Sequence, residues 1–216
     1  MMAIPETWMP DAGPGTTEQV VNSPDTTVSD RKAQLRQEAF VVRDALPAAE
    51  RAAGAETIAS RPFPLKIERG TIVSAFSPMK SEINPVPLMR KLADAGAKLA
   101  LPAIAGRGRP LIMRAWNFGD AMAKGQWGIR EPVPEAPEVA PDILIVPLAV
   151  FDRAGHRIGY GAGYYDMTIN ALRAKKKVTA IGIAFAAQEI PHVPATERDA
   201  RLDLVLTERE VIDLRE

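Results

Sequence analysis

Residues 142–150 read Asp-Ile-Leu-Ile-Val-Pro-Leu-Ala-Val and give the strongest strand signal in the chain. The run is apolar at consecutive positions, so a strand formed there would have apolar side chains on both faces. Strands of this kind are typical of a parallel sheet that is covered by helices on both sides. We therefore expect a central buried strand here.

Alternating apolar strands and helices extend in both directions from this segment. Short apolar runs predict strands at 71–76, 98–101, 111–116, 178–185 and 202–207, with Pro102 breaking the second of these. Helices are predicted at 48–60, 85–95 and 164–174, and an earlier one runs from a cap at Ser29 or Asp30 to Leu46. In that earlier helix the apolar positions are Leu35, Ala39, Val42 and Leu46. Residues 117–141 are expected to be a loop.

This order predicts one α/β domain over residues 30–216, with a mainly parallel, Rossmann-like central sheet flanked by helices. Residues 1–29 carry four prolines among Gly, Thr, Asp and Ser, a composition too poor in apolar area to offset its ordering entropy. We expect these residues to form a flexible N-terminal arm.

Composition excludes several classes of site. The 216 residues include 27 Lys plus Arg, 27 Asp plus Glu and no Cys. Disulfides, thiolate metal sites and a thiol nucleophile are therefore excluded, and the balanced charge argues against nucleic-acid binding. With only two His in the chain, metal chemistry would depend on carboxylates, which favours Mg²⁺ or Ca²⁺. No uncharged apolar run approaches the roughly 20 residues of a membrane span, and residues 1–30 lack a secretory pattern, so we expect a cytoplasmic protein with no membrane contact.

The stretch that follows the central strand, residues 151–166 (FDRAGHRIGYGAGYYD), carries the densest chemistry. Three alternating glycines before a helix allow the backbone to curl and direct N–H groups at an anion. Arg157 adds a fixed charge for phosphate, and Asp166 in the first helical turn could hold Mg²⁺. The spacing is neither that of a Walker A loop nor that of the dinucleotide fingerprint. A tight turn without any ligand stays the alternative.

The same stretch resembles the signature of the 5-formyltetrahydrofolate cyclo-ligase family, also called methenyltetrahydrofolate synthetases. The resemblance implies ATP- and Mg²⁺-dependent closure of 5-formyltetrahydrofolate to 5,10-methenyltetrahydrofolate, with release of ADP and phosphate. Residues 32–36 (KAQLR) resemble the family's amino-terminal motif, although two cations at this spacing on a helix can equally be solvated. The implied catalytic residues are Lys32, Arg36 and Arg157. The implied ATP-binding residues are Lys32, Arg36, Arg157, Ile158, Gly159, Tyr160, Gly161, Ala162, Gly163, Tyr164 and Tyr165.

Two further segments resemble the family's folate-binding and metal-binding parts. Residues 76–83 (FSPMKSEI) and 127–132 (WGIREP) imply a folate site that contains Ser77, Glu82, Trp127, Tyr160, Gly161, Ala162, Gly163 and Tyr164. Without the resemblance, Glu82 could belong to a helix cap and Trp127 could cover the core. Residues 191–207 imply that Asp199 joins Asp166 at Mg²⁺, with Asp203 as an alternative ligand or a structural residue. Ala162 and Arg198 depart from the family pattern.

Two other functions stay open at this stage. A paralogue could use the same ATP site on another substrate, although Glu82 and Trp127 argue for folate. A non-catalytic sugar-phosphate-binding module could use the glycine-rich loop without the carboxylate pair. In each case the expected partners are small molecules, namely ATP and 5-formyltetrahydrofolate for the main interpretation, and the chain is expected to be a monomer.

Overall fold

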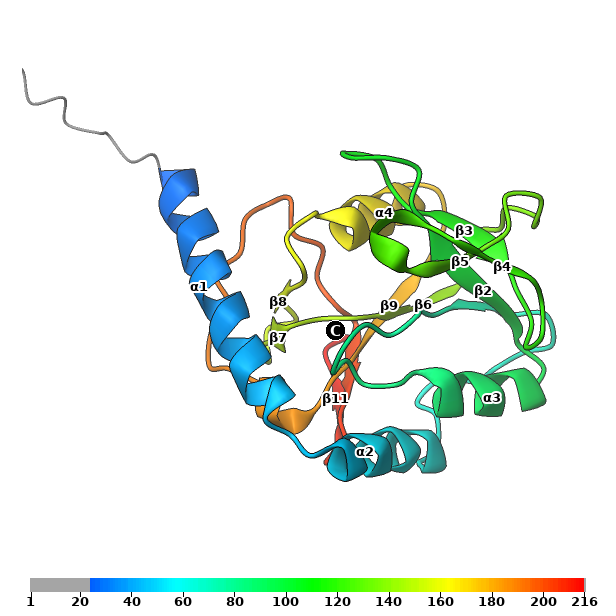
Figure 1. Cartoon of the computed structure of the whole chain (residues 1–216), viewed down its shortest axis with the longest axis horizontal. Helices are drawn as coiled ribbons and strands as arrows, with labels where there is room; N and C mark the ends of the chain where they lie inside the picture. The colour runs from blue at the N-terminus through cyan, green and yellow to red at the C-terminus, as the bar shows by residue number, and fades with distance from the viewer. Residues whose placement is uncertain (1–23, 216) are drawn as a thin grey trace, which may run out of the picture.

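The computed structural model describes residues 24–215 and is built around a seven-stranded sheet with the order β11-β10-β9-β6-β1-β2-β3 (Figure 1). Five of these strands run parallel, and the edge strands β3 and β11 pair antiparallel to their neighbours. The strands are β1 (Ile72–Ser74), β2 (Lys98–Ala103), β3 (Ile112–Ala115), β6 (Ile143–Val146), β9 (Thr179–Ile183), β10 (Leu204–Leu206) and β11 (Val211–Asp213). The predicted α/β fold with a mainly parallel central sheet is confirmed.

Helices cover both faces of the sheet, and β6 shows how the sequence specifies this. Ile143 and Ile145 pack into one core cluster with α2 (Ala48–Ser60) and α3 (Val86–Asp94). Leu144 and Val146 point to the opposite face, where α4 (Tyr164–Arg173) packs. Because successive side chains of a strand alternate between faces, a continuous apolar run serves both layers at once.

Helix α1 (Pro24–Asp44) lies against neither main face of the sheet. It packs on a small hairpin formed by β7 (Val150–Phe151) and β8 (Arg157–Ile158), beside which it runs in Figure 1. A separate apolar cluster, which includes Leu35, Ala39, Val150 and Ile158, joins the helix to the hairpin. Helix α1 is therefore held at one end of the sheet, next to the loops that leave the parallel strands.

The direction of the chain along the sheet changes between β1 and β6. From β1 the chain passes through α3 to β2 on one side, whereas from β6 it proceeds to β9 and β10 on the other. Strands β1 and β6 are nonetheless parallel neighbours, with Val73 opposite Ile143 and Ser74 opposite Leu144. In an open α/β sheet such a switch point leaves a crevice beyond the carboxyl ends of the two strands, where ligands bind. The loops that begin there are residues 75–85 and 147–149.

Several predicted boundaries need correction. Helix α1 begins at Pro24, so residues 24–29 are helical, and the remainder of the predicted arm lies outside the described residues. The predicted strand at 142–150 is divided, since β6 ends at Val146 and β7 begins at Val150. Pro147 follows the end of β6 directly and has no N–H to continue the sheet's hydrogen bonds. The predicted loop 117–141 contains β4 (Met122–Lys124), the 3₁₀ turn η1 (Gln126–Gly128) and β5 (Arg130–Pro132).

Pro102 does not break β2, which continues to Ala103. The carbonyl of Ala100 accepts from the Ala75 N–H toward β1, and the carbonyl of Leu99 accepts from Trp116 toward β3. Because successive residues of a strand face opposite neighbours, Pro102 faces the same side as Ala100. Strand β1 has already ended at Ser74, so there is no strand at this point that an N–H of residue 102 would bond, and the proline costs the sheet no hydrogen bond.

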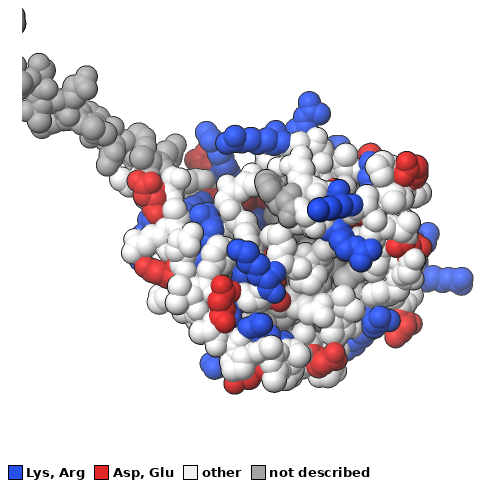
Figure 2. Space-filling model, in the orientation of Figure 1, with Lys and Arg blue, Asp and Glu red and all other residues white. Residues whose placement is uncertain are grey.

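The charge on the molecule is mixed rather than segregated. Basic and acidic side chains are interspersed over the face drawn in Figure 2, in keeping with equal numbers of each in the sequence. No helix in the described part of the chain is both long and apolar enough to cross a membrane. Any binding of an anion therefore depends on a local arrangement of side chains and backbone rather than on the overall field.

Candidate active site at the β1–β6 switch point

The glycine-rich loop, residues 159–163, connects β8 to α4 and exposes its backbone to the space beside α1. Gly161 has φ +99° and Gly163, the N-cap of α4, has φ +69°, conformations that L side chains rarely adopt. Within the described residues, the N–H groups of 160–163 donate to no protein acceptor. These free donors lie at the amino-terminal end of α4, where the helix dipole also favours negative charge. Unpaired N–H groups at the start of a helix are a suitable arrangement for an anion, as predicted for this loop.

Arg36 comes from α1 and lies directly over this loop. Its Nε donates to the carbonyl of Gly159 at 2.7 Å, and a Cβ placed on Gly161 would lie 3.3 Å from its guanidinium carbon. Only glycine at this position permits so close an approach. Burial lowers the pKa of Arg36, although a guanidinium stays charged in proteins. The amino-terminal motif and the glycine-rich loop, both assigned to ATP by the resemblance, are thus in direct contact.

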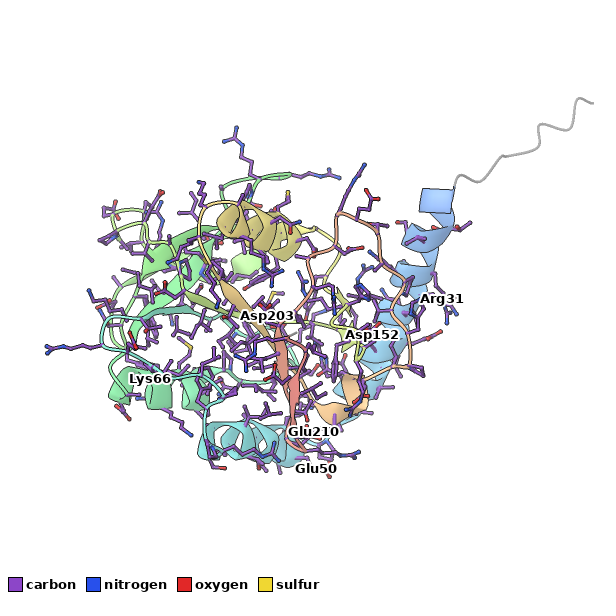
Figure 3. The ribbon with its side chains drawn as sticks, turned by 180° about the vertical axis from the view of Figure 1, so that it is seen from behind. Arg31, Glu50, Lys66, Asp152, Asp203 and Glu210 are labelled. Carbon is purple, nitrogen blue, oxygen red and sulfur yellow. The ribbon has the colours of Figure 1, made fainter. Side chains whose placement is uncertain are left out.

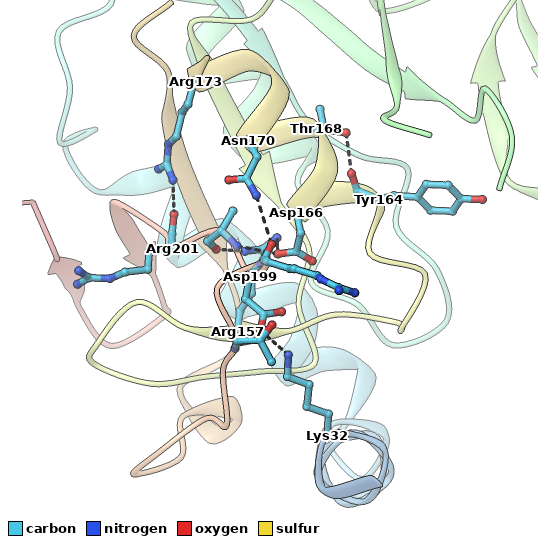
Figure 4. Close-up of polar contacts among 12 residues, drawn as sticks. Lys32, Arg157, Tyr164, Asp166, Thr168, Asn170, Arg173, Asp199 and Arg201 are labelled. Atoms are coloured by element: carbon cyan, nitrogen blue, oxygen red, sulfur yellow. Dashed lines mark hydrogen bonds and ion pairs between the residues drawn. The ribbon is translucent and has the colours of Figure 1, made fainter. Parts of the chain in front are cut away.

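Lys32, one helical turn earlier, meets Asp199. Its Nζ lies 2.6 Å from Asp199 Oδ2, and both side chains are mostly buried (Figure 4). The same carboxylate oxygen accepts from the Thr196 N–H at 2.6 Å and from the Thr196 hydroxyl at 3.0 Å. Burial opposes ionisation of Asp199, but the bonds from Lys32 and Thr196 outweigh it and hold its pKa below the usual range. Asp199 is therefore a carboxylate at neutral pH.

Arg157 is turned into the protein rather than toward an open surface. It is only 5% exposed, and its guanidinium donates to the carbonyl of Ala200 and, at 2.8 Å, to Asp166 Oδ1 (Figure 4). Burial lowers the pKa of Arg157, and the neighbouring charge of Asp166 opposes that shift. The Ala200 N–H also donates to Asp166 Oδ1 at 3.1 Å. Arg157 thus joins the start of α4 to the segment that carries Asp199.

Asp166 and Asp199 are the two predicted metal ligands, and the structure brings them to the same place. Asp166 accepts from the backbone of Ala200, the residue next to Asp199. In each carboxylate one oxygen takes all the hydrogen bonds found among the described residues, which leaves the other oxygen for a cation. The described residues contain no cluster of three or more Asp, Glu or His side chains arranged for a metal ion. Two carboxylates suit Mg²⁺, which takes its remaining ligands from water and phosphate.

The alternative ligand Asp203 lies elsewhere. It accepts from Arg173 at 2.7 Å and from the Ala180 N–H at 2.7 Å. Its partner Arg173 is the last residue of α4, whereas Asp166 is in the first turn (Figure 4). Asp203 thus lies at the end of the helix remote from Asp166. Asp203 is therefore a structural residue that ties α4 to the sheet.

The expected folate side begins at the loop after β1. Glu82 Oε2 accepts from the Met79 N–H at 2.7 Å, and burial raises the pKa of Glu82 despite this bond. The Ser77 hydroxyl donates to the carbonyl of Arg130 at 2.9 Å and so ties this loop to β5. Trp127 belongs to the turn η1, three residues before Arg130, and its side chain lies outside the described part of the structure. The loop after β1 and strand β5, both assigned to folate by the resemblance, are therefore in contact.

Tyr160 links the two sides of the site. Its ring lies 5.2 Å from that of Phe40 on α1, and its hydroxyl accepts from Arg43 at 3.1 Å. Burial and the charge of Glu82 raise the pKa of Tyr160 to about 12. The hydroxyl of Tyr165 is buried next to Glu82 and Arg157, and burial raises its pKa as well. Both phenols are therefore neutral hydrogen-bonding groups between the expected nucleotide and folate sides.

Two contributors were missed or misread in the sequence. Val42, expected on the buried face of α1, is 47% exposed, whereas Arg43 is 1% exposed. Arg43 lies seven residues after Arg36, so the helix places both on the face toward the glycine-rich loop, a spacing that could have revealed it. Asp152, given no role, is buried and accepts from the N–H groups of Ala154, His156 and Val193. It fixes the hairpin from which the loop starts.

Comparison with known proteins agrees with this arrangement. Residues 28–208 match the model of the 5-formyltetrahydrofolate cyclo-ligase family. The chain is 33% identical over 193 residues to the 5-formyltetrahydrofolate cyclo-ligase of Mycolicibacterium smegmatis, covering 85% of this chain and 97% of that protein. The Escherichia coli (strain K12) enzyme of the same name is 30% identical over 147 residues, covering 64% and 79%.

A solved structure shows the same fold. The 5,10-methenyltetrahydrofolate synthetase of Aquifex aeolicus superposes with a TM-score of 0.71 at 29% identity, covering 86% of this chain and 93% of that one. The sequence match spans nearly the whole described domain, including α1, the glycine-rich loop and Asp199. The chain belongs to the 5-formyltetrahydrofolate cyclo-ligase family.

Proposed function

We propose that this protein converts 5-formyltetrahydrofolate to 5,10-methenyltetrahydrofolate and consumes ATP in the process. One observation carries the proposal. At the β1–β6 switch point the glycine-rich loop, which suits an anion, lies near Glu82, a partly buried carboxylate on the loop that follows β1. The free N–H groups of residues 160–163 suit phosphate, and Glu82 suits the amino and ring N–H donors of a pterin. Family membership supplies the reaction.

On this proposal the phosphates of ATP occupy the glycine-rich loop. Arg36, which lies over Gly161, and Lys32, which is held by Asp199, offset the phosphate charge from one side, while the loop N–H groups offset it from the other. Arg157 is buried behind the loop and positions Asp166. Asp166 and Asp199 would hold a Mg²⁺ ion, which would neutralise phosphate charge when bound.

The chemistry then follows from positioning. The formyl oxygen of the substrate attacks the γ-phosphorus, and the bond to the bridging oxygen of ADP breaks. The neighbouring amine of the substrate attacks the activated formyl carbon, loses its proton, and phosphate leaves to give the cyclic product. The substrate supplies both nucleophiles, so no protein nucleophile is needed, which agrees with a chain that has no Cys. Tyr160 and Tyr165 lie between the two expected substrates and would orient the reacting groups.

The test is the absorbance of methenyltetrahydrofolate formed from 5-formyltetrahydrofolate, with ATP and Mg²⁺ supplied together or each omitted. The proposal expects product only when both are present. Hydrolysis of ATP without this product would indicate a paralogue that acts on another substrate. Failure to bind or use ATP at all would refute the nucleotide assignment, with binding measured separately by calorimetry.

A further inference from the structure

Arg43 is buried in the centre of the site and is incompletely satisfied. Its Nε donates to the Ser81 hydroxyl at 3.0 Å and its Nη2 donates to the Tyr160 hydroxyl at 3.1 Å. The guanidinium also stacks near the ring of Phe40, with its central carbon 5.0 Å from the ring centre. Among the residues that the structure describes, Nη1 is buried and has no partner. One edge of the guanidinium is therefore fixed by the protein while the other is unused.

Two more unpartnered buried atoms belong to the same group of side chains. They are Glu82 Oε1, an acceptor, and the Tyr165 hydroxyl. Glu82 directly follows Ser81. The Tyr160 hydroxyl is within hydrogen-bonding reach of its carboxylate, the charges of Arg43 and Glu82 act on each other through space, and that of Glu82 also acts on Tyr165. No ion pair joins Arg43 to Glu82 within the described part of the chain. A buried polar group without a partner is costly, so three in one place indicate groups that a ligand satisfies.

An unused donor beside an unused acceptor matches one edge of a pterin. That edge presents two kinds of donor, the 2-amino group and the ring N–H, next to an acceptor, the 4-oxo group. Glu82 can take the donors, as the proposed function holds, but a carboxylate gives nothing to the 4-oxo oxygen. Two donors in the cluster have no partner among the described residues, Arg43 Nη1 and the Tyr165 hydroxyl. Arg43 is the charged one of the two, and a charged donor makes a stronger hydrogen bond than a neutral one.

We propose that Arg43 binds the 4-oxo oxygen of the folate substrate and selects 4-oxo over 4-amino pterins. The inference rests on the proposed function and extends its folate site by a residue on α1. Because Ser81, Tyr160 and Phe40 already hold the guanidinium, binding orders little that is not ordered beforehand, which preserves affinity. A 4-amino group in the same place would set donor against donor and leave both unpaired.

The test compares two ligands on three proteins. The ligands are 5-formyltetrahydrofolate and its 4-amino-4-deoxy counterpart, and the proteins are the wild type, Arg43→Met and Arg31→Met. Arg31 is exposed on the outer side of the same helix, as Figure 3 shows, and serves as the matched control. Calorimetry gives four affinities for the wild type and Arg43→Met. Glu82 is present in both proteins. Its contribution to the binding of each ligand therefore cancels when the 4-oxo to 4-amino affinity ratio of the wild type is compared with that of Arg43→Met.

The proposal expects Arg43→Met to weaken binding of the 4-oxo ligand at least about tenfold, to weaken the 4-amino ligand much less, and to leave ATP affinity within about twofold. Arg31→Met should change nothing. Equal losses for both ligands would assign Arg43 a structural role only and overturn the proposal, as would no loss for either. If Arg43→Met fails to fold, Arg43→Lys provides the comparison. A single ammonium group cannot supply all the N–H donors of a guanidinium, so the ratio of 4-oxo to 4-amino affinity should still fall.

The two proposals fail in different ways. If the wild type neither binds nor cyclises 5-formyltetrahydrofolate, the proposed function is wrong and Arg43 has no folate to select. If the wild type cyclises it and Arg43→Met keeps the full preference for the 4-oxo ligand, only the assignment of Arg43 is wrong.

Discussion

Lys32 Nζ and Asp199 Oδ2 lie 2.6 Å apart although 167 residues separate them in the chain. The contact joins α1 to the segment after β9, one helical turn from the contact of Arg36 with the glycine-rich loop. Since the carboxylate has a lowered pKa in the folded state, the pair also links stability to pH. On the proposed function this pair holds Lys32 in place for phosphate, and the predictions below test that role and those of its neighbours.

Lys32→Met should make the stability of the protein less dependent on acid pH. A carboxyl group whose folded pKa is lowered contributes stability that is present above its unfolded pKa, about 4, and is lost as the pH falls through the folded value. The wild type should therefore exceed Lys32→Met by about 1.5 kcal/mol at pH 7, the scale of a hydrogen bond to a charged group. The difference should shrink below about pH 4. Urea unfolding at a series of pH values measures it, and a constant difference would contradict the assignment.

Glu82→Gln should weaken folate binding without lowering the stability of the protein. The folded pKa of Glu82 is raised, so the ionised form costs stability once the pH exceeds its unfolded pKa of about 4.3. The variant should thus be at least as stable as the wild type at pH 7, with an advantage that vanishes near pH 4. Binding of 5-formyltetrahydrofolate should nevertheless weaken at least about tenfold, with ATP affinity unchanged. Glu50→Gln, on the exposed side of α2, is the control and should alter neither.

Gly161→Ala should damage nucleotide binding beyond its effect on folding. A Cβ there would lie 3.3 Å from the Arg36 guanidinium, and the residue has φ +99°. Gly119 has the same φ of +99° with no atom within 4 Å of its added Cβ, so Gly119→Ala carries the same backbone strain alone. Both variants should lose about 1–2 kcal/mol in unfolding experiments. Only Gly161→Ala should weaken ATP binding about tenfold, and equal ATP affinities in the two variants would refute the contact.

Asp166→Asn and Asp199→Asn should raise the Mg²⁺ concentration needed for half-maximal activity, because each removes a charged ligand. Asp203→Asn is the matched comparison, since it breaks the pair with Arg173 but lies at the other end of α4. It should reduce the melting temperature and leave the Mg²⁺ requirement unchanged. A shifted Mg²⁺ requirement in Asp203→Asn alone would reverse the assignment of the second ligand.

The sequence predicted the central architecture well because apolar periodicity alone specified it. The run at 142–150 implied a buried strand, and β6 serves both core clusters. The ends of the strands were harder to predict, because they depend on where the neighbouring strands end. Pro147 follows the end of β6, whereas Pro102 stays inside β2 because β1 has already ended beside it. Strand β11 and the hairpin of β4 and β5 were missed because strands of three residues carry too little pattern.

The individual motifs of the site were predictable from the sequence, but the contacts between their side chains were not. The glycine-rich loop and the α1 cations carry local signals, and the structure brings them together. Burial of Arg157 behind Asp166 could not be predicted, because it depends on where residues 199 and 200 pass. Arg43 was missed for a related reason: the apolar pattern placed Val42 inside, whereas polar contacts to Ser81 and Tyr160 set the rotation of the helix.

Helix α1 packs against residues toward the carboxyl end of the chain, and this has a consequence for biosynthesis. Lys32 and Arg36 leave the ribosome first, yet their partners are Asp199 and Gly159, 167 and 123 residues later. Contacts between such distant residues form late, since closing a long loop is entropically costly. A nascent chain that ends before residue 199 therefore carries the motif without the site. Nucleotide binding should arise only when synthesis is nearly complete, so prematurely terminated chains should not bind ATP.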